Sequence, residues 1–164
     1  MLRFLLCWEL GWWLEGKFRR KKLYKQGELA AAQKGKRFLV IGEPDGEYPC
    51  GDVTVDLREN SKCPVYVKEN VESLTMFKNK QFGAVFVSHV LEHVSDPHKA
   101  MAELARVADQ VLVAYPYPWR LATWIVPGHA WLMFRNREGG FKFVKYIGTT
   151  NVANRYGSRV GLSR

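Results

Sequence analysis

The sequence predicts an α/β fold with a mostly parallel sheet of about five to seven strands. The strongest evidence is the segment 81–107, where an apolar run at 84–87 is followed by a polar turn, Ser88 and His89, and then by an amphipathic helix that begins near residue 96. A short apolar run that leads through a turn into an amphipathic helix is typical of the βα half of a parallel-sheet unit. Because ligands bind at the carboxyl ends of such strands, the turn is expected to lie at a functional site.

Length and charge restrict the possible classes of protein. A chain of 164 residues is expected to form one domain, and an apolar content of 47% is ordinary for a globular protein. The formal net charge is +9, which favours contact with nucleic acid or an anionic membrane surface, although a solvated basic face explains it equally well. The basic residues that cluster near the N-terminus are Lys17, Arg19, Arg20, Lys21, Lys22 and Lys25.

The three cysteines are Cys7, Cys50 and Cys63. Their number is odd and no CxxC pair occurs, which argues against a disulfide framework and against a structural zinc site. A reducing compartment is the simpler expectation, so we expect a cytoplasmic protein, with contact to a membrane surface as an alternative.

Residues 1–35 are expected to form a helical N-terminal arm that stops at Gly35. The apolar stretch 2–18 carries three tryptophans, but charged residues interrupt it, and it is shorter than the ~20 apolar residues that span a bilayer. It is either an interfacial helix or a helix packed on the sheet or on a partner subunit. We favour packing.

The domain proper is expected over residues 36–148, followed by a basic C-terminal tail at 149–164. No full helix fits between the first two strands, because residues 47–52 are too few and contain a proline and a glycine. The expected strands lie at 38–41, 53–55, 65–67, 84–87 and 110–114, followed by a short helix at 119–124 and a hairpin that pairs 131–134 with 141–144.

The sequence of the central segment resembles that of class I S-adenosylmethionine-dependent methyltransferases. The resemblance is strongest to the methyltransferase type 11 group with its Leu-Glu-His signature. The matching residues are Phe82, Ser88, His89, Leu91, Glu92, His93, Asp96, Pro97, Arg106 and Val107. The resemblance implies a Rossmann-like fold, here shortened, with S-adenosylmethionine as cofactor and methyl transfer as the reaction. It does not identify the methyl acceptor.

By the same resemblance, the turn after the first strand is expected to contact the cofactor through Gly42, Glu43 and Gly46. Taken alone, the sequence of this turn is more typical of an ordinary turn that ends a strand. Glycines suit such a turn because the backbone must approach the ligand closely. This turn departs from the family pattern at two positions, where Val40 replaces the leading aspartate and Pro44 replaces the middle glycine.

Further cofactor contacts are expected at the ends of the next strands. The carboxylate of Asp56, followed by Leu57, is placed to accept hydrogen bonds from the ribose, although a turn-capping role is the alternative. The resemblance places Asn70 and Val71 at the adenine edge of the cofactor. It places Ser88 and His89 near the transferable methyl group. Asn70 otherwise caps a turn.

His89 is the candidate general base, because an imidazole titrates near neutrality, and Tyr115 is a second candidate. Residues His89, Glu92 and His93 also spell the H-x-x-E-H pattern of zinc peptidases. Such a site needs both histidines on one continuous helix, and the helix here restarts only at Asp96. No metal is therefore expected.

Two functions from different classes remain open at this stage. One is an S-adenosylmethionine-dependent methyltransferase. The other is a methyltransferase-like scaffold or subunit without cofactor binding, which uses its basic arm to bind protein, nucleic acid or membrane. The altered turn and the missing crossover helix motivate the second function.

Overall fold

The computed structural model describes residues 2–44, 46–58, 61–125 and 128–146. The tail expected from residue 149 onward lies outside these residues. Helix α1 spans Leu2–Gln33, and the sheet strands are β1 Arg37–Ile41, β2 Val53–Asp56, β3 Tyr66–Lys68, β4 Phe82–Ser88 and β5 Val111–Ala114. Helix α2 spans Pro97–Val107, α3 spans Leu121–Ile125, and β6 Trp131–Arg135 pairs with β7 Phe141–Lys145.

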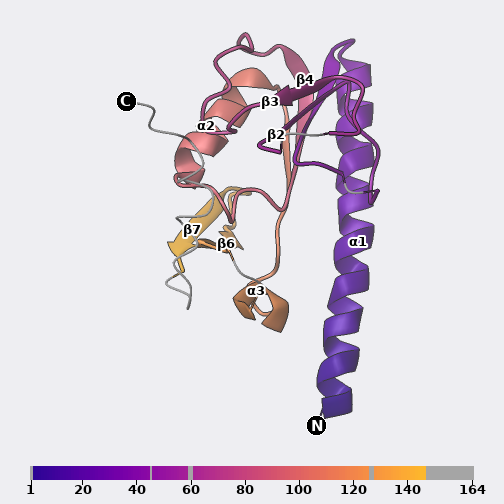
Figure 1. The fold of residues 1–164 in the computed structure, drawn as a ribbon, viewed down its shortest axis with the longest axis vertical. Coiled ribbons are helices and arrows are strands. Elements are labelled where there is room, and N and C mark those ends of the chain that lie inside the picture. Colours follow the sequence, from indigo (N-terminus) through magenta and orange to yellow (C-terminus); the bar gives the residue numbers. More distant parts are fainter. Residues whose placement is uncertain (1, 45, 59–60, 126–127, 147–164) are drawn as a thin grey trace.

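The five strands form a parallel sheet in the order β3-β2-β1-β4-β5, and β6 and β7 form a separate antiparallel hairpin. Helices α1 and α2 cover opposite faces of the sheet (Figure 1). The Rossmann-like fold class expected from the sequence is confirmed, as are the positions of the strands to within about one or two residues.

Alternate side chains of the strands build two core layers. On the central strand β4, Val85 and Val87 face the α2 layer, while Ala84 and Phe86 face the α1 layer. All seven residues of β4 are buried, as expected for a strand covered on both faces. The hairpin extends the α2 layer through Met133.

Helix α1 lies very close to the sheet at two glycines. A Cβ atom on Gly27 would stand 2.6 Å from the ring of Phe38, and one on Gly83 would stand 2.7 Å from the Cα of Ala31. Neither position therefore has room for a side chain. Gly83 follows Phe82 on β4, and the close passage of α1 explains why this position carries no side chain.

The connection between β1 and β2 has no helix among its described residues, 42–44 and 46–52, as the sequence predicts. Tyr48 of this connection instead packs in the α1 layer against Tyr24 and Phe86. Helix α1 and this connection together cover the face that a crossover helix would cover.

One expectation from the sequence is wrong, because Cys50 and Cys63 form a disulfide, with their Cα atoms 5.6 Å apart. The odd number of cysteines is explained by Cys7, which is unpaired and exposed on α1. The bond joins the β1–β2 connection to the β2–β3 connection. A cross-link here holds two segments that lack packed helices.

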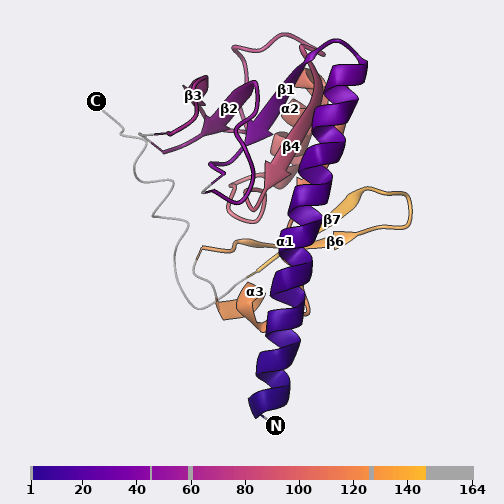
Figure 2. The same ribbon diagram turned by 90° about the vertical axis from the view of Figure 1, so that its right-hand side faces the viewer.

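Figure 2 shows that α1 extends well beyond the sheet at its N-terminal end. The helix has no stretch apolar enough to cross a bilayer, and the same holds for every other helix among the described residues.

Candidate cofactor and catalytic site

The carboxyl ends of β1 and β4 meet at Gly42. Its backbone φ is 96°, in the region that favours glycine, and its N–H donates to the carbonyl oxygen of Val55 at 2.9 Å. A Cβ on Gly42 would stand 3.2 Å from the carbonyl oxygen of Ser88 and 3.1 Å from Val90. Gly46 also has a positive φ, 81°, with open space around it. Gly42 and Gly46 thus both adopt a backbone conformation that residues with a side chain disfavour.

Asp56 links this turn to the end of β2. Its Oδ2 accepts from the backbone N–H of Glu43 at 2.6 Å, and its Oδ1 accepts from the N–H of Arg58 at 3.0 Å. The turn-capping role is therefore observed. Since each carboxylate oxygen has two lone pairs, Asp56 retains the capacity to accept further bonds from a ribose. The next residue, Leu57, is exposed.

The other residues expected around the adenosine moiety are held by local contacts. The Glu43 carboxylate accepts from the hydroxyl of Ser61 at 2.6 Å. Asn70 Oδ1 accepts from the N–H of Glu72 at 2.9 Å, which is the turn-capping alternative. Val71 is buried in the α2 layer, so its side chain belongs to the core.

His89 lies at the end of β4 with a φ of 52°, a conformation that is uncommon for residues other than glycine and is often found at functional sites. Its Nε2 is 3.1 Å from Nη1 of Arg20, and its Nδ1 is 3.1 Å from Oε1 of Glu92. Because a guanidinium only donates, Nε2 accepts and Nδ1 carries the proton. The lone pair that a general base needs is therefore engaged by Arg20.

Arg20 comes from α1 and is nearly buried. It also forms an ion pair with Glu47, with 2.6 Å between Nη2 and Oε2. A chain of polar contacts thus runs from Glu47 through Arg20 and His89 to Glu92, across the end of β1. In the sequence, Arg20 is distinguished only as part of a basic cluster, and no local pattern indicates its contacts, because His89 is 69 positions away.

Glu92 is fully buried beneath His89. Burial acts to raise the pKa of Glu92, but the hydrogen bond from His89 and the charges of His89 and His93 outweigh it, so the pKa lies below its usual range. The carboxylate is therefore ionised at neutral pH and holds the His89 ring in one orientation.

Tyr115 directly follows β5, and the N–H of His89 donates to the carbonyl oxygen of Ala114 at 3.0 Å, so the two candidate bases lie on neighbouring strand ends. The ring of Tyr115 is buried, and its centroid lies 4.9 Å from the guanidinium carbon of Arg19. Nη2 of the same arginine donates a hydrogen bond to the carbonyl oxygen of Tyr115. Helix α1 therefore contributes arginines to both strand ends.

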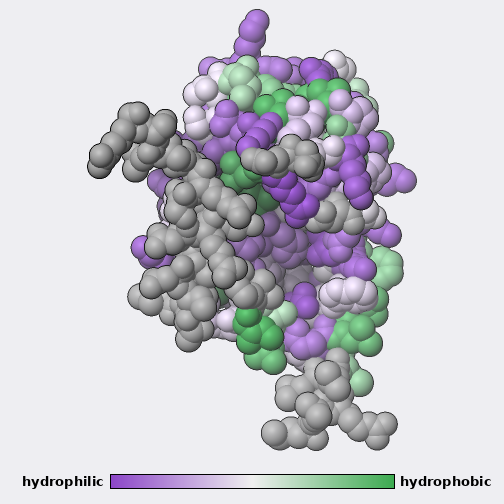
Figure 3. Space-filling model, viewed as in Figure 1, coloured by the Kyte–Doolittle hydropathy of each residue, from purple (hydrophilic) through white to green (hydrophobic). Residues whose placement is uncertain are grey.

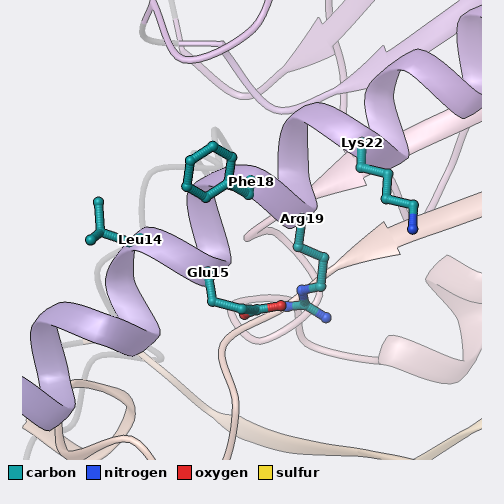
Figure 4. Close-up of a pocket in the computed structure, with 5 residues that line it drawn as sticks. All are labelled: Leu14, Glu15, Phe18, Arg19 and Lys22. Carbon is teal, nitrogen blue, oxygen red and sulfur yellow. The ribbon is translucent and has the colours of Figure 1, made fainter.

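A shallow hollow of about 650 Å³ lies along α1 (Figure 4), lined by Leu14, Glu15, Phe18, Arg19 and Lys22. It adjoins the end of β5 through Arg19, which contacts Tyr115.

Part of the chain matches a known protein family. Residues 50–110, from the approach to β2 to the end of α2, match the family model described as a methyltransferase domain. No curated protein matches the chain.

Among solved structures, the chain is similar to an S-adenosylmethionine-dependent methyltransferase from Mesorhizobium loti, with 10% sequence identity and a TM-score of 0.42. The alignment covers 76% of this chain and 65% of that chain.

Proposed function

We propose that this chain binds S-adenosylmethionine at the carboxyl edge of its sheet and transfers the methyl group to an acceptor. The observation that carries the proposal is the methyltransferase-domain match over residues 50–110, which includes Asp56, Asn70 and His89. The structure brings the first and last of these to the same edge as the Gly42 turn. The acceptor is not identified by any residue described here.

The residues present fit the two ends of this cofactor. Asp56 would accept from the ribose hydroxyls, and the backbone of the Gly42–Gly46 turn would lie against the sugar. Val40 is fully buried and cannot receive the amino group of the methionine moiety. Glu47 and Arg20, paired at 2.6 Å, offer the opposite charges to the ammonium and carboxylate of that moiety.

Bound S-adenosylmethionine supplies an activated methyl group, so the chain has mainly to align the acceptor with it. His89 would remove a proton from the acceptor. Its Nε2 would be available if Arg20 bound the carboxylate of the cofactor in place of the imidazole. Cofactor binding and activation of the base would then depend on one side chain.

The binding of S-adenosylmethionine, measured by calorimetry, tests this proposal. We expect Asp56→Asn to weaken binding about 10- to 100-fold, because the amide keeps one acceptor but loses the charge that strengthens the ribose bonds. Asp52→Asn is the matched control, since the Asp52 carboxylate accepts a backbone bond from Phe38 at 2.7 Å at the opposite edge of the sheet. Absence of binding by the unaltered chain at millimolar cofactor would reject the proposal and leave the scaffold function.

We also propose that the outer face of α1 contacts an anionic membrane surface. Its large exposed apolar side chains lie beside exposed lysines, and Figure 3 shows apolar surface gathered over the first half of α1. Tryptophans beside lysines suit the boundary between lipid headgroups and acyl chains. The large exposed apolar residues in the first half of the helix are Trp8, Leu10, Trp13, Leu14 and Phe18.

A further inference from the structure

Three side chains outside the proposed cofactor site converge beyond the end of β4. Glu92, His93 and His129 each offer a ligand atom, and these atoms all lie within 4.8 Å of one another. The segment that carries His129 is held in place by backbone bonds, because the N–H of Ala130 donates to the carbonyl oxygen of Glu92 at 2.7 Å. The cluster is therefore a fixed part of the fold.

The two histidines are oriented in the same manner. Nδ1 of His93 is 2.8 Å from the carbonyl oxygen of Gly128, and Nδ1 of His129 is 2.8 Å from that of Thr123. A carbonyl only accepts, so each ring carries a proton on Nδ1 and, when neutral, has its lone pair on Nε2. This arrangement, in which one nitrogen donates to a carbonyl and the other is a ligand, is typical of metal-binding histidines.

The third member has an unsatisfied atom. Glu92 is 1% exposed, and its Oε1 accepts from His89, but its Oε2 has no hydrogen-bond partner among the described residues. A buried carboxylate oxygen without a partner costs about 1–3 kcal/mol or more. A cation bound between this oxygen and the two imidazoles would satisfy it.

We propose that Glu92, His93 and His129 form a binding site for a divalent transition-metal ion, with Zn²⁺ as the best fit. Two imidazoles and one carboxylate are ligands that Zn²⁺ prefers, and three protein ligands leave a position for water. Ligand atoms around tetrahedral Zn²⁺ lie about 3.4 Å apart when each bond is about 2.1 Å. The side chains must therefore move together slightly on binding.

The site differs from the H-x-x-E-H pattern in the sequence, because His129 takes the place of His89. Glu92 then connects two functions: one oxygen orients His89, and the other holds the metal. The proposal does not depend on cofactor binding, since none of the three ligands belongs to the proposed cofactor site.

Titration of the full chain with Zn²⁺, followed by calorimetry, tests the site. The chain carries Cys7→Ser to remove the unpaired thiol, keeps its disulfide, and is freed of metal with a chelator. We expect one equivalent of Zn²⁺ to bind. Bound Co²⁺ should give the visible absorption bands of a site with a low coordination number. Glu92→Gln and His129→Gln should each weaken Zn²⁺ binding at least about 100-fold.

His98→Gln is the matched control, because His98 is exposed on α2, against Phe143, and outside the cluster. It should bind Zn²⁺ like the parent chain. Thermal unfolding gives a second measure: Zn²⁺ should raise the Tm of the parent and of His98→Gln, but not that of His129→Gln. Were Glu92→Gln not to fold, His129→Gln alone decides. Absence of stoichiometric binding, or equal affinity in the parent and in His129→Gln, overturns the proposal.

Discussion

At the scale of the residue, Tyr24 shows how one side chain of α1 is fitted to the sheet. Its ring packs against Phe38, Tyr48 and Phe86, and its hydroxyl donates to the carbonyl oxygen of Cys50 at 2.9 Å. Burial, with smaller contributions from the charges of nearby carboxylates, raises its pKa to about 12. The folded state therefore favours the neutral phenol.

We expect Tyr24→Phe to change the alkaline dependence of stability. The pKa of Tyr24 is higher in the folded chain than the ordinary value of 10.0. The contribution of Tyr24 to the free energy of unfolding is therefore complete below pH 10.0 and is lost as the pH rises toward about 12. At pH values above both the ordinary and the folded-state pKa, the loss of stability is on the order of 2 kcal/mol. At neutral pH the variant should be less stable by about 1 kcal/mol, for the lost hydrogen bond.

Urea unfolding at about pH 8 and about pH 11 measures this difference. The gap between the parent chain and Tyr24→Phe should narrow at the higher pH. Tyr146→Phe is the matched control, because its hydroxyl also donates to a carbonyl, that of Trp124 at 3.0 Å, but far from the sheet. Parallel pH profiles for the parent and Tyr24→Phe would contradict the argument.

At the scale of the element, the sequence predicted those features that depend on local patterns. The apolar run of β4 identifies a buried strand, and Asp96 before Pro97 identifies the start of α2, where its carboxylate accepts from the N–H groups of His98 and Lys99. Helix α1 is continuous through Gly27, which a pattern alone does not show. The glycine is tolerated because the ring of Phe38 fills its space.

The site was predictable to the extent that topology brings strand ends together. Parallel strands share one carboxyl edge, so the approach of Asp56 to the Gly42 turn follows from the order of the elements. Arg20 and His129 could not be found in this way. Arg20 meets His89 at the strand ends, and His129 meets Glu92 in the separate cluster, each across a long separation in the chain.

The disulfide was missed because cysteine spacing does not show that two connections run side by side. We expect the double change Cys50→Ala and Cys63→Ala to lower the free energy of unfolding by about 2–3 kcal/mol. The reason is that the bond closes a loop in the unfolded chain between two cysteines that lie 13 positions apart. Cys7→Ala, which removes the exposed unpaired thiol, should have little effect. If oxidised and reduced parent chains unfold at the same urea concentration, the bond contributes no stability.

At the scale of the whole molecule, α1 acts as a support that is longer than the sheet it covers, since its 32 residues extend about 48 Å. The side of α1 that faces the domain contacts the sheet or the segment after β5 along most of the helix. Beyond the sheet, the ring of Trp12 lies 5.3 Å from that of Tyr117, and Glu9 accepts from the N–H of Leu121 at 2.7 Å. The expectation that the arm packs on the domain is thus met on one side of the helix, while the opposite side stays exposed.

That exposed side leads to the last prediction, which concerns binding to lipid vesicles. The chain should sediment with vesicles that contain an anionic lipid, and less with neutral ones, because each lysine near an anionic surface contributes about 1 kcal/mol. Trp13→Ser with Phe18→Ser should reduce the bound fraction about tenfold or more, since both side chains are exposed in the free protein. Leu29→Ser is the matched control, because Leu29 is 55% exposed on the same helix but lies at its other end.

Added salt should weaken the binding of the chain to anionic vesicles, because it screens the charges of the lysines. Equal sedimentation of the double variant and the parent would show that this face contacts something other than lipid, and binding to a nucleic acid with a steep salt dependence would identify the alternative partner.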